Sequence, residues 1–128
     1  MNDTDFDDWL QTTFADTQGF TVLIVLLSIA DGRVDPVRSA HLHVIGDDIR
    51  WPDMARHLDG SGAAWDGVVF FRADRGGLVV DDVARDRLDQ LVRALNGDRT
   101  LIRDGDFFNR DGLRLRLDDA EPQPPVLN

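Results

Sequence analysis

The sequence contains no cysteine, no lysine and no tyrosine, and Glu121 is its only glutamate. Without cysteine, the chain can form no disulfide, bind no metal through a thiolate and use no cysteine nucleophile. The only strongly apolar run, residues 20–30, has 11 residues and is too short to span a bilayer as a helix. The first residues are acidic, unlike the basic segment that opens a secretory signal. We therefore expect a soluble, cytoplasmic protein that does not bind membranes.

The charge of the chain is strongly negative and is carried almost entirely by two residue types. All 14 basic residues are arginine, and 23 of the 24 acidic residues are aspartate, so the formal net charge is -10. A high-GC genome accounts for this composition, and salt adaptation is an alternative origin of the aspartate excess. The negative charge repels nucleic acid, which we therefore do not expect as a partner. It favours a basic protein partner, because opposite charges accelerate association.

Length and composition indicate one globular domain. A chain of 128 residues has the common size of a single domain, and its 42% hydrophobic and 30% charged residues are ordinary for a folded protein. We expect residues 1–120 to form this domain. Residues 121–128 hold three of the five prolines and are expected to form a flexible tail.

The spacing of apolar residues predicts an α+β fold. Helical spacing predicts long helices over residues 3–18 and 81–96, and a short helix that begins at Pro52. Strands are predicted over residues 20–30, 39–51 and 67–73, as a brief strand over 78–80, and as two strands within 99–119. We expect a mixed or mainly antiparallel sheet of about five strands, with the N-terminal helix and helix 81–96 on one side of it.

Two histidines suggest a metal site. His41 and His43 stand two apart in an apolar run, so on a strand both rings face the same side. Imidazole binds zinc, copper, iron and nickel, and a third ligand would complete a divalent metal site. The nearby candidates for this ligand are His57, Asp47, Asp48 and Asp53. The alternative is that the two rings are only the exposed face of a strand, and no other cofactor is expected.

A second group of oxygen donors lies late in the chain. The stretch "RDGDFFNRDG" contains Asp104, Asp106, Asn109 and Asp111, which could hold Ca²⁺ or Mg²⁺. The spacing does not match an EF-hand, because Asn109 stands where that loop requires glycine. Asp, Asn and Gly are also the usual residues of turns, so we interpret this segment as a turn-rich loop.

The arginines of the later strands and turns suggest a second binding surface. They are Arg72, Arg75, Arg103, Arg110, Arg114 and Arg116. If Arg72, Arg103, Arg114 and Arg116 converge, they could bind a carboxylate, a phosphate or an acidic partner through paired hydrogen bonds. The alternative is that they form the solvated face of a sheet and are offset by neighbouring aspartates.

No set of residues in the sequence indicates nucleophilic catalysis. None of the three serines lies in a strand-turn-helix glycine elbow. We therefore expect a non-enzymatic interaction module, of the inhibitor or immunity type, that binds a basic partner. One alternative is a small metal- or ligand-binding domain that uses His41, His43 and a carboxylate. The other is a homodimer joined by edge strands or by an exposed aromatic patch made of Trp51, Trp65 and either Phe107 or Phe108.

Overall fold

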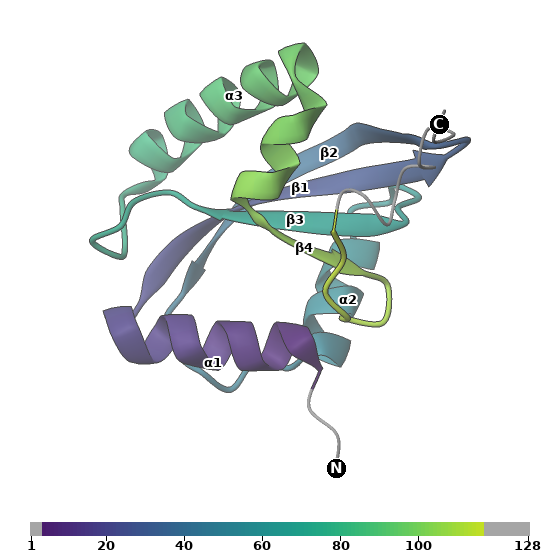
Figure 1. Cartoon of the computed structure of the whole chain (residues 1–128). Coiled ribbons are helices and arrows are strands. Elements are labelled where there is room, and N and C mark those ends of the chain that lie inside the picture. The colour runs from purple at the N-terminus through teal and green to yellow at the C-terminus, as the bar shows by residue number, and fades with distance from the viewer. Residues whose placement is uncertain (1–3, 117–128) are drawn as a thin grey trace, which may run out of the picture.

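A computed structural model describes residues 4–116, and in it a four-stranded antiparallel sheet lies between two layers of helices (Figure 1). The elements, in chain order, are α1 (Asp5–Thr17), β1 (Phe20–Ala30), β2 (Arg33–Val44), α2 (Trp51–Asp59), β3 (Gly67–Arg72), α3 (Asp81–Gly97), the 3-10 helix η1 (Arg99–Asp104) and β4 (Asp106–Asn109). The strand order is β2-β1-β3-β4. The α+β class and the antiparallel sheet confirm the prediction. None of the described helices is long and apolar enough to cross a membrane.

Strand β1 lies inside the sheet because its sequence is apolar on both faces. Its first eight residues, 20–27, are buried, and successive side chains point to opposite sides of the sheet. Val22 and Ile24 pack with α1 and α2, whereas Val25 and Leu27 pack with α3 and η1. A strand with two apolar faces suits a sheet that is covered on both sides.

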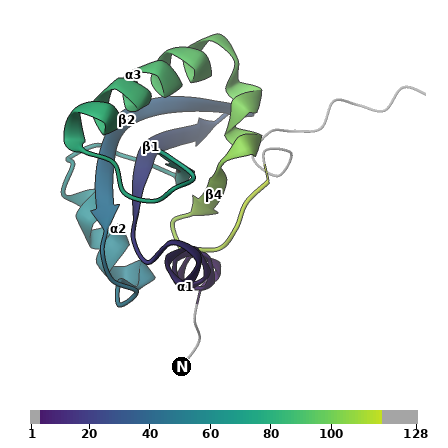
Figure 2. The ribbon, with the colours of Figure 1, turned by 90° about the vertical axis from the view of Figure 1, so that its left-hand side faces the viewer.

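The long helices lie on opposite faces of the sheet, whereas the sequence predicted both on one side (Figure 2). Phe6 and Leu10 of α1 belong to the core on one face, and Leu88 and Leu95 of α3 belong to cores on the other. The physical reason is the second apolar face of β1, which would remain exposed to water if both helices packed on the same face of the sheet.

Strands β1 and β2 form a hairpin through Asp31 and Gly32, which have φ values of 53° and 75°. Two successive residues with positive φ make the type I′ turn that Asp-Gly favours. β2 therefore begins at Arg33 rather than at Ser39, and the prediction of its start was wrong. β2 contains Pro36, which it tolerates because β2 is an edge strand and its pairing with β1 shifts register between Arg38 and Pro36.

The chain after β2 contains less strand than the sequence predicted. β2 ends at Val44, residues 45–50 of the predicted strand lead into α2, and Trp51 is the first residue of that helix. Residues 99–104, also predicted as strand, form η1. The carboxylate of Asp98 starts η1 by accepting a hydrogen bond from the backbone N–H of Thr100 at 3.0 Å.

Two further predicted strands are absent from the described residues. The segment 78–80 is irregular and leads directly into α3. The predicted strand around Leu113 and Leu115 is reduced to one bridge between Arg114 and Phe108. The sheet of the described part thus has four strands instead of about five. Leu117 and the predicted tail, 121–128, lie outside the described residues.

The alternative that these aromatic residues form an exposed dimer surface is wrong. Trp51, Trp65, Phe107 and Phe108 are all buried, with at most 5% of their surface exposed. The two tryptophan rings pack edge to face, with their centroids 6.2 Å apart. Each indole N–H finds an oxygen, so these rings can be buried without an unsatisfied donor.

Candidate metal centre

Strand β2 directs two imidazole rings toward the α3 face of the sheet. His41 pairs with Leu23 on β1, and His43 pairs with Thr21. Leu23 packs against Leu88 of α3, and side chains directly opposite each other on paired strands share a face. The two histidine side chains are partly exposed, at 21% and 31%. They are therefore held by the sheet and remain accessible to an ion from solvent.

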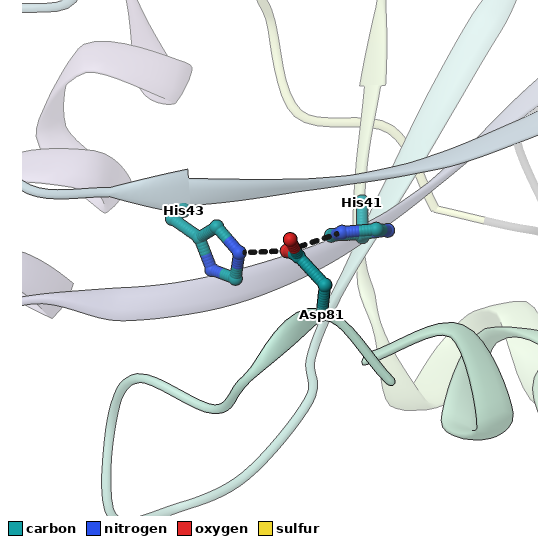
Figure 3. A group of neighbouring side chains, drawn as sticks. All are labelled: His41, His43 and Asp81. Carbon is teal, nitrogen blue, oxygen red and sulfur yellow. Dashed lines mark hydrogen bonds and ion pairs between the residues drawn. The ribbon is translucent and has the colours of Figure 1, made fainter. Parts of the chain in front are cut away.

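The first residue of α3 places a carboxylate between these rings (Figure 3). One oxygen of Asp81, Oδ1, lies 3.1 Å from Nε2 of His41 and 2.5 Å from Nε2 of His43. An ionised carboxylate only accepts hydrogen bonds, so both Nε2 atoms act as donors in this arrangement. One oxygen atom therefore joins two rings of β2 to the start of α3.

Hydrogen bonding keeps Asp81 ionised. The hydrogen bond from His43, followed by that from His41, lowers the pKa of the Asp81 carboxyl from its ordinary value, against a smaller opposing effect of desolvation. The position of Asp81 in the first turn of α3 acts in the same direction, because the N-terminus of a helix favours negative charge. The site therefore supplies an anionic oxygen beside two imidazole nitrogens.

A buried threonine fixes the orientation of the second ring. Thr21 is fully buried, and its Oγ1 lies 2.8 Å from Nδ1 of His43. The same hydroxyl accepts the backbone N–H of Val79 at 3.0 Å and lies 3.4 Å from the Val79 carbonyl oxygen. Val79 is two residues before Asp81, so Thr21 connects the His43 ring to the segment that positions the carboxylate.

These three side chains have the composition of a metal site. Single ligand atoms of His41, His43 and Asp81 all lie within 4.8 Å of one another, and no other such group of histidine and carboxylate side chains occurs in residues 4–116. Two imidazoles and one carboxylate are the protein ligands of several catalytic zinc sites and of non-haem iron oxygenases. Such a set leaves coordination positions open for water or for another molecule.

The third ligands predicted from the sequence lie elsewhere. His57 lies on α2, on the opposite side of the sheet, where it lines a small cleft with Ile24 and Leu26. The backbone carbonyl of Asp47 accepts a hydrogen bond from the Arg50 side chain at 2.6 Å. Asp48 and Asp53 are also outside the three-residue group. The structure therefore brings together only the two histidines of the predicted set.

Asp81 was missed because it lies 38 residues from His43 in the sequence, at the expected start of helix 81–96. Two predicted elements together could have pointed to Asp81: a strand that carries two histidines on one face, and a helix that begins with aspartate. They identify the third ligand only if the start of this helix is known to lie over that strand.

The oxygen donors of the segment predicted as a turn-rich loop serve the fold, and the prediction was partly wrong because Asp104 ends η1 and residues 106–109 form β4. Oδ1 of Asn109 accepts hydrogen bonds from the backbone N–H groups of Asp111 at 2.8 Å and Leu113 at 3.0 Å. Asp106 pairs with Arg114 through an Oδ1 to Nη1 distance of 2.8 Å. The first arrangement is the local turn that asparagine favours, so this loop is explained without an ion.

The predicted arginine set is divided by the fold. One pocket is lined by Arg103, Arg114 and Arg116. Arg72 does not line it and instead donates to the backbone carbonyl of Arg75 at 2.7 Å. Arg110 lies 4.2 Å from the ring centroid of Trp65. Three of the four arginines proposed as an anion surface therefore share one location.

Comparison with known proteins gives no family assignment. No protein-family model matches the chain, and neither the curated proteins nor the solved structures contain a significant match.

Proposed function

We propose that this protein is a transition-metal-binding domain that holds a zinc-like divalent ion. The ligands are Nε2 of His41, Nε2 of His43 and a carboxylate oxygen of Asp81. The observation that carries the proposal is the single Asp81 oxygen within hydrogen-bond distance of both ring nitrogens. These donors match the ligand preference of zinc, which binds imidazole nitrogen and carboxylate oxygen.

The side chains of the site must adjust locally to bind the ion. Zinc lies about 2.0–2.2 Å from nitrogen and oxygen ligands, which places tetrahedral ligand atoms about 3.3 Å apart. The distance from Asp81 Oδ1 to His43 Nε2 must therefore increase from 2.5 Å. The Asp81 side chain is 61% exposed at a helix terminus and can rotate outward, and the partly exposed rings can turn to bring ligand atoms that lie within 4.8 Å of one another to this spacing.

The groups that form hydrogen bonds with the His43 ring also suit a bound ion. A metal on Nε2 of His43 requires the ring hydrogen on Nδ1, where the Thr21 hydroxyl can accept it. Thr21 can then donate its own hydrogen to the Val79 carbonyl and still accept the Val79 N–H. Every polar atom of this group keeps a partner when the hydrogen moves from Nε2 to Nδ1.

The proposal concerns binding and assigns no reaction. Three protein ligands leave a fourth position for water or for a donor from another molecule. The basic partner and the homodimer expected from charge and strand pattern remain predictions. A divalent ion would add positive charge to a chain with a net charge of -10, which makes metal binding electrostatically favourable.

The proposal is tested by measuring zinc affinity in protein purified without a histidine tag. We expect one zinc ion per chain, and a loss of affinity of at least about 100-fold in His41→Ala, His43→Ala and Asp81→Ala, because each removes a direct ligand. His57→Ala is the matched control and should bind as the unmodified chain does. Retention of affinity in the three ligand variants, or an equal loss in His57→Ala, would contradict the proposal.

A further inference from the structure

The pocket lined by Arg103, Arg114 and Arg116 lies at the opposite edge of the sheet from the two histidines. It has a volume of about 310 Å³ and lies beside β4, whereas His41 and His43 are on β2. Its lining residues are Ile102, Arg103, Gly105, Phe107, Arg114, Leu115 and Arg116. This volume is at the lower end of the range for small-molecule sites.

The walls of this pocket are held by backbone pairing. The backbone N–H of Leu115 donates to the Phe107 carbonyl at 2.8 Å, and Arg114 forms a bridge with Phe108. Residues 113–115 therefore run beside β4 and present the arginines on either side of Leu115. On the other wall, the N–H of Gly105 donates to the carbonyl of Ile102 at 3.1 Å and closes η1.

Gly105 allows the chain to pass closely over the sheet. A Cβ atom at this position would lie 2.6 Å from Cγ2 of Val69 and 2.9 Å from the ring of Phe71, both on β3. Such distances are shorter than carbon atoms tolerate without movement of the backbone. The glycine therefore sets how near η1 and its arginine approach the sheet.

The lining of the pocket is rich in arginine although the protein is acidic. Three of its seven lining residues are arginine and none is acidic, although Arg114 is paired with Asp106 and the whole chain has a net charge of -10. The remaining walls are apolar, from Ile102, Phe107 and Leu115. Guanidinium groups bind carboxylate and phosphate through paired hydrogen bonds, and apolar walls bury the body of a ligand.

Arg114 lies at the edge of the pocket, and its side chain is held toward the α1 face of the sheet. Its Nη1 lies 2.8 Å from Oδ1 of Asp106, and its guanidinium carbon lies 5.0 Å from the ring centroid of Phe108, which belongs to the core on that face. The apolar walls of the pocket belong to the core on the α3 face, so recognition of an anion falls mainly to Arg103 and Arg116. These two arginines also make contacts within the protein, and the five N–H donors of a guanidinium allow each to bind an anion as well.

We infer that this pocket binds a small organic anion that carries a carboxylate or phosphate on an apolar body. The arginines recognise the anionic group, and Ile102, Phe107 and Leu115 contact the apolar part. This inference is independent of the metal site, because none of the pocket's lining residues is among the three metal ligands.

The test is an NMR titration of the full chain with phenyl phosphate, in the presence of EDTA so that metal binding plays no part. We expect the amide of Gly105 and the methyl groups of Leu115 to shift. Inorganic phosphate should bind at least about fivefold more weakly, because it lacks the apolar group, and neutral phenol should bind more weakly still. Shifts that map elsewhere, or phenol binding as tightly as phenyl phosphate, would overturn the inference.

Arginine variants then distinguish specific binding in the pocket from nonspecific attraction of phenyl phosphate to any arginine. Arg103→Gln and Arg116→Gln should each weaken phenyl phosphate binding about 5–10-fold, because a guanidinium donates charged hydrogen bonds to the anion. Arg56→Gln is the matched control, since its side chain is 79% exposed on α2. Thermal unfolding must show that each variant is folded. Equal weakening in Arg56→Gln, or no weakening in either pocket variant, would overturn the inference.

Discussion

The hydroxyl oxygen of Thr21 lies 2.8 Å from Nδ1 of His43, across the pairing of β1 with β2. Thr21 is buried, and its hydroxyl also joins Val79 in the segment that leads to Asp81. One side chain therefore fixes both the ring and the backbone that carries the carboxylate. Outer-shell groups of this kind set the orientation of metal ligands.

Replacing Thr21 with valine should weaken zinc binding about 10–100-fold, because Nδ1 of His43 loses its partner. The same change leaves the Val79 N–H without its acceptor, so the free energy of unfolding should fall by about 1–3 kcal/mol. Thr21→Ser keeps the hydroxyl and should retain most of the affinity. Zinc titration and urea unfolding measure the two effects separately. If valine and serine variants bind zinc equally well, the hydroxyl has no part in the site.

Removing the Asp81 carboxylate should change how stability depends on pH in metal-free protein. Because folding lowers the pKa of Asp81, its contribution to stability is present above the pKa of the unfolded chain and is lost as the pH falls through the folded pKa. Asp81→Asn should therefore be less stable than the original chain at pH 7, and the difference should shrink below about pH 4. Urea unfolding at several pH values measures this. A difference that stays constant down to about pH 3 would contradict the prediction.

Asp7 joins the first two helices, and its removal should be costly. Its Oδ2 accepts the backbone N–H of Thr4 at 3.1 Å, and its Oδ1 accepts that of Trp51 at 2.7 Å. Asp7→Ala leaves a buried donor on Trp51 and removes half of a capping box, so we expect a loss of about 3 kcal/mol in unfolding free energy. Asp8→Ala, at an exposed position of the same helix turn, should cost about 0.5 kcal/mol or less. Similar losses in the two variants would show that Asp7 has no special role.

Two glycines allow backbone strain to be separated from a steric clash. Gly62 and Gly112 have nearly the same φ, 80° and 77°, but only the second has a close neighbour. A Cβ atom at Gly112 would lie 2.6 Å from Cγ of Trp51, whereas a Cβ atom at Gly62 would have no neighbouring atom within 4 Å. Alanine should cost about 1 kcal/mol at Gly62 through strain, and at least about 2 kcal/mol more at Gly112. Equal losses in chemical unfolding would contradict the close packing of Gly112 on Trp51.

Local patterns in the sequence predicted the main elements of the fold. The bounds of β1 agree with the prediction of residues 20–30, because an apolar run between turn residues depends little on distant contacts. The prediction of helix 81–96 agrees with α3 to within one residue. The predictions that failed concern features set by tertiary context, such as the start of β2 and the packing of α3 opposite α1.

The sequence alone predicted two of the three proposed metal ligands. The two-residue spacing of His41 and His43 indicated a shared face, which depends only on strand geometry. Asp81 could not be found by spacing, because its approach depends on the crossing of α3 over β2. The nearby carboxylates of Asp47 and Asp53 were preferred for their closeness in sequence, which says little about closeness in space.

The most direct test of the metal site follows the imidazole nitrogens during a zinc titration. The chain contains only three histidines, so a long-range ¹H–¹⁵N spectrum of their rings resolves each one. We predict that zinc shifts the Nε2 signals of His41 and His43 together, saturates at one equivalent and leaves His57 unchanged. A titration that leaves the first two rings unaffected, or that shifts all three alike, would contradict the site.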